Sequence, residues 1–272
     1  YNQNVSSMKD IFTDIAKGNK VNIHKVLNIS NEIFKDTQDV YTIIDSISEI
    51  REIDDYTYRH SINVSLYAML LGKWLGLGEQ SLKELIQTGV LHDIGKGRVD
   101  QDILNKPGKL TDEEFEEIKK HTIYGYEICK PVIWLNDDMK NGVLMHHEKS
   151  DGSGYPFGLK EDKISLYAKI ISVCDVYDAL NSRRVYKEEQ TPFDTIKQMM
   201  DIGMGTMNYK ILHTFLQNIV SIYIGSKVKM NTGDIGEIVF TPPEKLHMPI
   251  VKINGEYIDL SKSKKYKIEK LI

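Results

Sequence analysis

The sequence has few cysteines and no long apolar run, and both features restrict what the chain can be. Its two cysteines, Cys129 and Cys174, have neither CxxC nor zinc-finger spacing, which excludes a disulfide-stapled scaffold and predicts free thiols in a reducing compartment. The apolar stretch 66–77 is interrupted by Gly72 and Lys73, and it is shorter than the roughly 18 residues that a membrane-spanning helix needs. We therefore expect a protein without a membrane span.

A secretory leader and an excess of positive charge are also missing. No basic segment followed by an apolar one opens the chain, which predicts a cytoplasmic location. The net charge of −4 over 272 residues argues against a broad surface for nucleic-acid polymers, although it is compatible with a small anionic substrate. The first residue is Tyr1 rather than methionine, which leaves open that the sequence is a piece of a longer protein.

The spacing of apolar residues predicts a mainly α fold with three segments. Residues 1–53 form helix-spaced apolar faces with a break at 28–31, and we expect a packing collar, a homodimerisation helix or the end of an upstream sensor domain. Residues 54–224 are expected to form the main helical bundle. Residues 225–272 alternate as short strands and predict a small C-terminal β-module, whose lysines between 262 and 270 form a solvated end.

Capping and turn signals support this division. The sequence from Thr111 to Glu114 has the form of a capping box and predicts a helix that continues through Ile128. Pro192 suits the first position of another helix, and Asn254 with Gly255 predicts a hairpin turn in the β-module.

The doublet formed by His92 and Asp93 is the first chemical signal. Imidazole nitrogen and carboxylate oxygen suit a first-row ion such as iron or manganese, and a carboxylate with two oxygens can bridge two ions. The doublet follows the amphipathic run 81–91, after which Gly95 relaxes the backbone and Lys96 supplies a positive charge. Alone, such a pair is more typical of an ordinary helix end than of a metal site.

Other histidines and carboxylates on separate predicted helices strengthen the metal hypothesis. The residues expected to converge as ligands are His60, His92, Asp93, His121, His146, His147 and Asp175. A carboxylate in the apolar helix 164–180 is costly unless it is paired or metal-bound. The alternative is that these are buried histidines with ordinary local hydrogen bonds. One or two such residues would be unremarkable, but five of the chain's eight histidines make this alternative improbable. The set suits two octahedral ions that share Asp93.

These motifs, in this order and with these gaps, resemble the HD-GYP domain, a branch of the HD metal-dependent phosphohydrolases. The matching segments are Tyr56-Thr57-x-x-His60-Ser61, His92-Asp93-Ile94-Gly95-Lys96, His121 with Gly125, His146-His147-Glu148-Lys149-Ser150-Asp151-Gly152-Ser153-Gly154-Tyr155-Pro156, and Asp175-Val176-Tyr177-Asp178-Ala179-Leu180 followed by Arg184 and Lys187. The resemblance covers about 54–190 and implies an HD-type helical bundle. It also implies hydrolysis of the bacterial second messenger cyclic di-GMP to pGpG, GMP or both, by attack of a hydroxide that bridges two metal ions.

The resemblance also implies roles for single residues. Lys96 would neutralise a phosphate oxygen or help the leaving group. Phosphate contacts are implied for Arg184 and Lys187, a guanine contact for Tyr155, and for Asp178 the orientation of a ligand histidine. Glu148 would orient a ligand or cap a helix, and both roles are open. The loop Gly154-Tyr155-Pro156 is implied to contact diguanylate cyclase domains.

Two departures from the family pattern matter. Tyr56 occupies the position where some members carry a carboxylate for a third metal, so we expect two metals, which puts efficient cleavage to GMP in doubt. Lys149 stands where arginine is usual and lacks its bidentate fork. Two alternatives to a cyclic di-GMP phosphodiesterase stay open: a receptor that binds a cyclic dinucleotide without turnover, and an HD hydrolase of another cyclic dinucleotide. The complete ligand set favours an enzyme.

Overall fold

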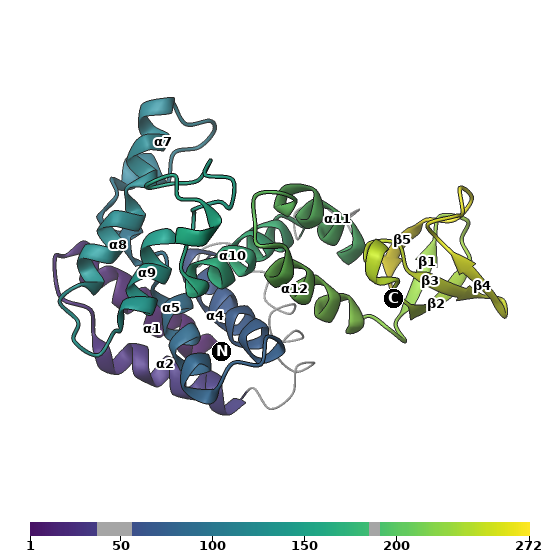
Figure 1. Ribbon diagram of the computed structural model, residues 1–272, viewed down its shortest axis with the longest axis horizontal. Helices are drawn as coiled ribbons and strands as arrows, with labels where there is room; N and C mark the ends of the chain where they lie inside the picture. Colours follow the sequence, from purple (N-terminus) through teal and green to yellow (C-terminus); the bar gives the residue numbers. More distant parts are fainter. Residues whose placement is uncertain (37–55, 185–190) are drawn as a thin grey trace. The chain divides into compact units, whose positions relative to one another are not determined.

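The computed structural model describes residues 1–36, 56–184 and 191–272, which form two compact units (Figure 1). Unit 1 consists of Tyr1–Asp175 with Gly205–Asn208, and unit 2 of Val176–Met204 with Tyr209–Ile272. The expected mainly α fold with a small C-terminal sheet is confirmed. The predicted boundaries after residues 53 and 224 remain predictions.

Helices make up unit 1. Their bounds are α1 Asn2–Ala16, α2 Ile23–Asp36, α4 Tyr56–Trp74, α5 Glu79–Leu91, the 3-10 helix η1 Ile94–Arg98, α6 Gln101–Leu104, α7 Asp112–Lys119, α8 His121–Cys129, α9 Asp137–Met145, the 3-10 helix η2 Glu161–Lys163, and the first half of α10 Leu166–Arg184. The central helix is α4, which packs against α1 and α5 and is buried on all sides from His60 to Gly72. A helix that is apolar all round belongs in a core. No helix in the described ranges is long and apolar enough to cross a membrane.

A close backbone contact between η1 and α8 fixes the position of the His92–Asp93 doublet. A Cβ atom at Gly95 would collide with the carbonyl oxygen of His121 and the amide nitrogen of Gly125. Gly95 is therefore needed because it lacks a side chain, rather than to relax the backbone as the sequence suggested. This contact brings the doublet beside the first turn of α8.

Two local predictions are wrong. The predicted break at 28–31 does not occur, because Ile29 and Ile33 are buried and α2 runs through the segment. The single helix predicted from Thr111 is two helices, α7 and α8, which meet at Lys120, so His121 opens a helix instead of lying within one. The capping box of Thr111 at the start of α7 is confirmed. Both cysteines are free and buried, as the spacing predicted.

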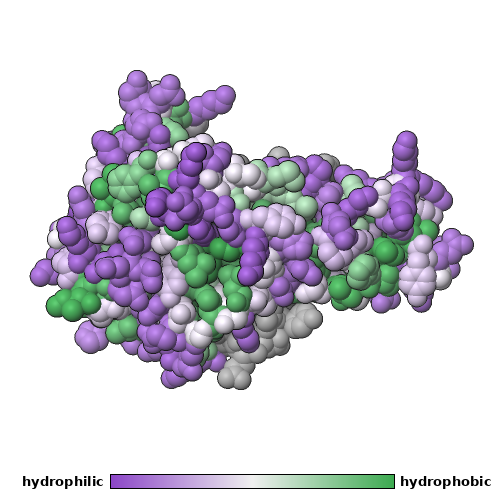
Figure 2. All heavy atoms as spheres, viewed as in Figure 1, coloured by the Kyte–Doolittle hydropathy of each residue, from purple (hydrophilic) through white to green (hydrophobic). Residues whose placement is uncertain are grey.

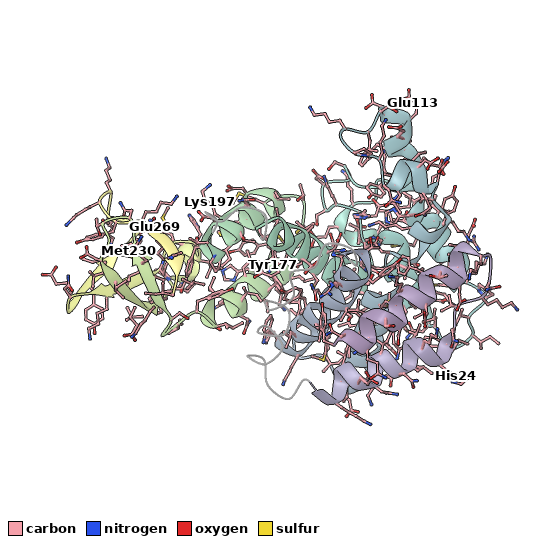
Figure 3. All side chains as sticks on the ribbon, turned by 180° about the vertical axis from the view of Figure 1, so that it is seen from behind. His24, Glu113, Tyr177, Lys197, Met230 and Glu269 are labelled. Atoms are coloured by element: carbon pink, nitrogen blue, oxygen red, sulfur yellow. The ribbon has the colours of Figure 1, made fainter. Side chains whose placement is uncertain are left out.

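Unit 2 combines helices with an antiparallel sheet. Beyond the end of α10 its elements are α11 Pro192–Gly203, α12 Tyr209–Ser221, β1 Lys227–Met230, β2 Ile235–Phe240, the 3-10 helix η3 Pro243–Lys245, β3 Ile250–Ile253, β4 Glu256–Asp259 and β5 Ile268–Leu271. The strand order is β4-β3-β2-β1-β5, and alternate side chains such as Met230 (labelled in Figure 3) form the buried face. The lysines between 262 and 270 are exposed, as predicted, but the sequence missed the strand β5, which pairs with β1 and buries Ile268.

Replacement of Gly95 by alanine should destabilise unit 1 by about 3 kcal/mol or more, because the new methyl group meets backbone atoms that cannot rotate away. Urea unfolding of Gly95→Ala measures the loss. Gly78→Ala is the matched control: its added Cβ meets no atom within 4 Å, so we expect a loss under about 1 kcal/mol. Equal stability of Gly95→Ala and the unsubstituted chain would contradict the close contact.

Candidate metal centre

Asp93 lies at the centre of a cluster of histidines, and its two carboxylate oxygens face different members. Oδ1 lies 3.4 Å from His121 Nε2 and 3.9 Å from His146 Nε2. Oδ2 lies 3.3 Å from His92 Nε2 and 3.8 Å from His60 Nε2. The carboxylate is almost completely buried, at 1% exposure. A carboxylate placed in this way has the arrangement needed to bridge two cations.

The remaining expected ligands complete two groups that share Asp93. One group is His60, His92 and Asp93, and the other is Asp93, His121, His146 and His147; the candidate ligand atoms of each group lie within 4.8 Å of one another. Asp175 adjoins both groups, with Oδ1 3.0 Å from His60 Nε2 and Oδ2 3.8 Å from His147 Nδ1. The structure therefore brings all seven sequence-predicted ligands together from α4, the α5–η1 junction, α8, the end of α9 and α10.

Backbone carbonyl groups orient three of the histidines. The Nδ1 atoms of His92, His121 and His146 lie 2.7, 2.6 and 2.8 Å from the carbonyl oxygens of Gly89, Ile118 and Val143 respectively. Each carbonyl belongs to the residue three positions earlier. Because a carbonyl oxygen can only accept, each Nδ1 carries a proton, so a neutral ring in this orientation has the lone pair of Nε2 directed toward Asp93. This is the tautomer that a metal ligand needs.

Burial keeps the imidazoles neutral. It lowers the pKa of His121 to about 4 and that of His147 to about 3, and it lowers the pKa of His146 well below its usual value. Burial alone would raise the pKa of Asp93, but the charge of the Lys96 ammonium group outweighs it and holds that pKa well below the usual value. At neutral pH, His121, His146 and His147 are therefore neutral nitrogen donors beside an ionised carboxylate.

The donor set fits a divalent cation. Nε2 of His121 lies 3.4 Å from Nε2 of His146, so two lone pairs face each other when both rings are neutral. Within the described residues, Nε2 of His92 and Oδ1 of Asp93 are buried and have no hydrogen-bond partner. Buried polar atoms without partners are costly, and a cation between them would remove that cost. Nitrogen and oxygen donors of this kind suit first-row ions.

Lys96 partly balances the charge of the centre. Its Nζ lies 2.5 Å from Asp93 Oδ2. Burial alone would lower the pKa of Lys96, but the Asp93 carboxylate raises it above its usual value, so the ammonium group stays charged. The phosphate contact predicted for Lys96 requires the same group, and it remains a prediction.

Glu148 clamps the loop that follows the two adjacent histidines. Its buried carboxylate accepts hydrogen bonds from the backbone N–H groups of Phe157 at 2.7 Å and Leu159 at 2.8 Å. Sequence reasoning left Glu148 between orienting a ligand and capping a helix, and the structure shows this third role. Through these two hydrogen bonds the carboxylate joins residues 157–159 to the segment that carries His146 and His147.

Tyr155 lies against the centre because the same loop folds back onto it. Its N–H donates to the carbonyl oxygen of His147 at 3.1 Å, and Gly154 packs so closely on Glu148 that a Cβ there would clash. The peptide bond between Tyr155 and Pro156 is cis. The ring centroid of Tyr155 lies 4.7 Å from that of His147. Burial, with the carboxylates of Asp93 and Asp175, raises the pKa of the Tyr155 phenol, so its hydroxyl remains a hydrogen-bond donor.

The structure describes the other sequence-predicted site residues only in part. Asp178 is buried in α10, three residues after Asp175, and its orienting role remains a prediction. Arg184 is the last residue of α10, with no side-chain position described, and Lys187 lies outside the described residues. The prediction about a third metal rests on the side chain of Tyr56, which likewise lies outside what the structure describes.

Sequence reasoning missed the clamp and the three orienting carbonyl groups. The carbonyl groups belong to residues of no distinctive type, so only their position three residues before a histidine could have pointed to them. For Glu148, the available signal was a carboxylate directly after two histidines and before a glycine-rich loop.

Comparisons with known proteins place the chain in a family. The family model described as HD domain matches residues 43–203. The chain is 33% identical over 251 residues to the cyclic di-GMP phosphodiesterase PA4108 of Pseudomonas aeruginosa, covering 91% of this chain and 60% of that protein. It is 36% identical over 154 residues to the 3'3'-cGAMP-specific phosphodiesterase 3 of Vibrio cholerae, covering 56% of this chain and 32% of that protein. The chain thus spans less than two thirds of either curated relative.

A solved structure shows the same fold. Bd1817, described as an HDG"Y"P protein from Bdellovibrio bacteriovorus, superposes with a TM-score of 0.62 at 18% identity, covering 80% of this chain and 69% of that one. The chain belongs to the HD domain family, in its HD-GYP branch. Its His/Asp cluster is the part of that fold that fits a divalent metal cofactor.

Replacement of Glu148 by glutamine should loosen the loop 151–159, because an amide keeps one acceptor oxygen and sets an NH₂ group against the second backbone N–H. We expect a stability loss of about 1–3 kcal/mol and faster proteolytic cleavage within the loop. Urea unfolding and limited proteolysis measure these effects. Glu127→Gln, which changes an exposed carboxylate on α8, is the control. Cleavage at the same rate in both variants would contradict the clamp.

The metal-free protein should lose stability as the pH falls from about 6.5 toward 4. Since the pKa of His121 is about 4 in the folded chain, an unfolded chain binds a proton in this range that the folded chain does not. Urea unfolding of chelator-treated protein at several pH values measures the slope. His121→Gln should flatten the slope, whereas His24→Gln, which removes an exposed histidine on α2, should leave it unchanged. A free energy of unfolding that rises toward acid pH would contradict the burial of neutral histidines.

Proposed function

We propose that this chain is a metal-dependent phosphodiesterase that hydrolyses cyclic di-GMP to pGpG, GMP or both in the cytoplasm. The observation that carries the proposal is the placement of Asp93, whose two oxygens face two separate groups of histidines. Such an arrangement suits two ions that act together on one phosphodiester. The names of the curated relatives support the choice of a cyclic dinucleotide as substrate.

The proposed cofactor is a pair of divalent ions, iron or manganese. One ion would be held by His60, His92, Asp93 and Asp175, and the other by Asp93, His121, His146 and His147. Bound there, the ions would supply Lewis acidity toward water and toward the phosphodiester. The nitrogen-rich set of neutral donors supports this choice over magnesium or calcium, which prefer oxygen.

The chain's own residues would orient and balance the reacting groups. Lys96 would place its ammonium group beside a phosphate oxygen, next to the carboxylate that already holds it. Tyr155, a protonated phenol on a clamped loop, would donate a hydrogen bond to the substrate and offer its ring to a guanine. Arg184, Lys187 and Asp178 keep the roles that the family resemblance implies.

A second substrate has specific support. One relative is named a 3'3'-cGAMP-specific phosphodiesterase, and the residues of the centre do not choose between the two purine rings of such a ligand. Hydrolysis of another cyclic dinucleotide is therefore the second candidate function. Contact of the Gly154-Tyr155-Pro156 loop with a diguanylate cyclase domain stays a proposal for a partner, and the adjacent Phe157, 59% exposed, would be accessible to it.

Anaerobic turnover tests the proposal directly. Protein loaded with iron or manganese should hydrolyse cyclic di-GMP, and Asp93→Ala should lower kcat by on the order of 10³-fold or more because it removes the shared carboxylate. Chromatography separates pGpG from GMP, and metal is counted on the same sample, with about two ions per chain expected. Asp201→Asn, which changes an exposed carboxylate on α11, should retain activity.

The same assay distinguishes the alternatives. A larger kcat/KM for 3'3'-cGAMP than for cyclic di-GMP would favour the second substrate. Tight binding of cyclic di-GMP without any product, in protein that carries its full metal content, would contradict an enzyme and favour a receptor.

A further inference from the structure

Lys119, the last residue of α7, lies next to the loop tyrosine of the candidate site. Its Nζ is 5.8 Å from the ring centroid of Tyr155 and 5.1 Å from that of Phe115, and it forms an ion pair with Glu116. The lysine side chain is only 23% exposed, although most lysine side chains extend into water. Aromatic rings and a carboxylate thus hold a cation beside the site, and none of the roles assigned above uses it.

The charges of α7 are arranged from one end of the helix to the other. Its first turn is acidic, and Glu113 in that turn points away from the rest of unit 1 (Figure 3). Hydrophilic atoms cover most of this helix in Figure 2. Its last turn is basic, and Lys120 follows it at the break before α8. The two lysines differ in placement, because Lys120 is exposed and pairs with Glu117 at 2.6 Å, whereas Lys119 contacts Tyr155.

The last turn of α7 is joined to the metal centre. The carbonyl oxygen of Ile118, the residue before Lys119, accepts the hydrogen bond from His121 Nδ1. On the other side, the Tyr155 ring that Lys119 contacts packs on the ring of His147. Lys119 therefore lies one aromatic ring beyond the candidate ligand histidines.

A cyclic dinucleotide carries two negative charges. Its ring contains two phosphodiesters, and only one can lie at Asp93 for cleavage. The other carries a full charge into a partly buried site, where a nearby ammonium group is strongly favourable. The present partner, Glu116, is 67% exposed, and an ion pair of that kind is weak enough to exchange for a phosphate.

We propose that Lys119 binds the phosphate that is not being cleaved in a cyclic dinucleotide, an inference that rests on the proposed function. Lys119 would then determine how tightly a two-phosphate substrate is held, while the metal centre determines the rate of cleavage. The proposal assigns Lys119 to substrate affinity and leaves the chemical step to the residues around Asp93.

Steady-state kinetics of metal-loaded variants test the inference. Lys119→Met should raise KM for cyclic di-GMP about tenfold with kcat within about twofold, because one charge-assisted contact is lost. Lys119→Arg should restore most of the affinity. Lys120→Met removes the same charge one residue further along and should match the unsubstituted chain. Metal content is counted in each variant, and Kd is measured for a phosphorothioate analogue of cyclic di-GMP that resists hydrolysis.

Each other outcome overturns the inference or the function in a recognisable way. Three results would overturn the role of Lys119. KM and Kd could be unchanged in Lys119→Met, or KM could rise as much in Lys120→Met as in Lys119→Met. The third is a Lys119→Met variant that loses kcat and metal content without a change in KM. Loaded protein that cleaves bis(p-nitrophenyl) phosphate but no cyclic dinucleotide would overturn the proposed function. In that case the inference is judged by binding of the phosphorothioate analogue alone. It would be overturned as well if the analogue bound Lys119→Met and the unsubstituted chain with the same Kd, or if it bound neither.

Discussion

The structure of unit 1 depends on one buried, ionised carboxylate. Asp93 is almost without exposure to water, and burying such a charge is costly unless partners of the right kind surround it. The chain supplies the ammonium group of Lys96 on one side, and on the others imidazole nitrogens that could share a cation with the carboxylate, from helices that are far apart in the sequence. A metal ion would meet the need for such partners more completely.

Several features of the fold serve that arrangement. Buried α4 and the apolar first half of α10 keep water away, which holds the histidines neutral and their lone pairs available. Carbonyl groups three residues earlier fix the orientation of three rings, so the helices themselves act as the outer layer of the site. Gly95 permits the backbone contact between η1 and α8 without which the doublet could not reach His121.

The loop after the paired histidines connects the residues proposed to bind substrate with the candidate metal centre. Glu148 follows His147 directly and holds the loop by two backbone hydrogen bonds, so a shift of the histidines would also move Tyr155. Lys119 contacts the same tyrosine from α7, whose last turn orients His121. The residues proposed to bind substrate and the residues proposed to bind metal are therefore held by shared contacts. This arrangement suits an enzyme whose substrate must lie in line with two ions.

The sequence by itself determined many local features and indicated which residues to expect as metal ligands. A capping box gave the helix start at Thr111, and a proline suited to the first helical position gave the start at Pro192. Alternation gave the first four strands, and the order of the motifs gave the HD-GYP resemblance with its seven expected ligand residues. Only the tertiary structure decided which oxygen of Asp93 faces which histidine, how Glu148 holds the loop, and that β5 completes the sheet. These features arise from backbone atoms and from contacts between distant segments. Residue type and spacing do not predict backbone contacts, because any residue can supply a carbonyl group. They do not predict contacts between distant segments either, because a strand can pair only where the fold has placed a partner edge.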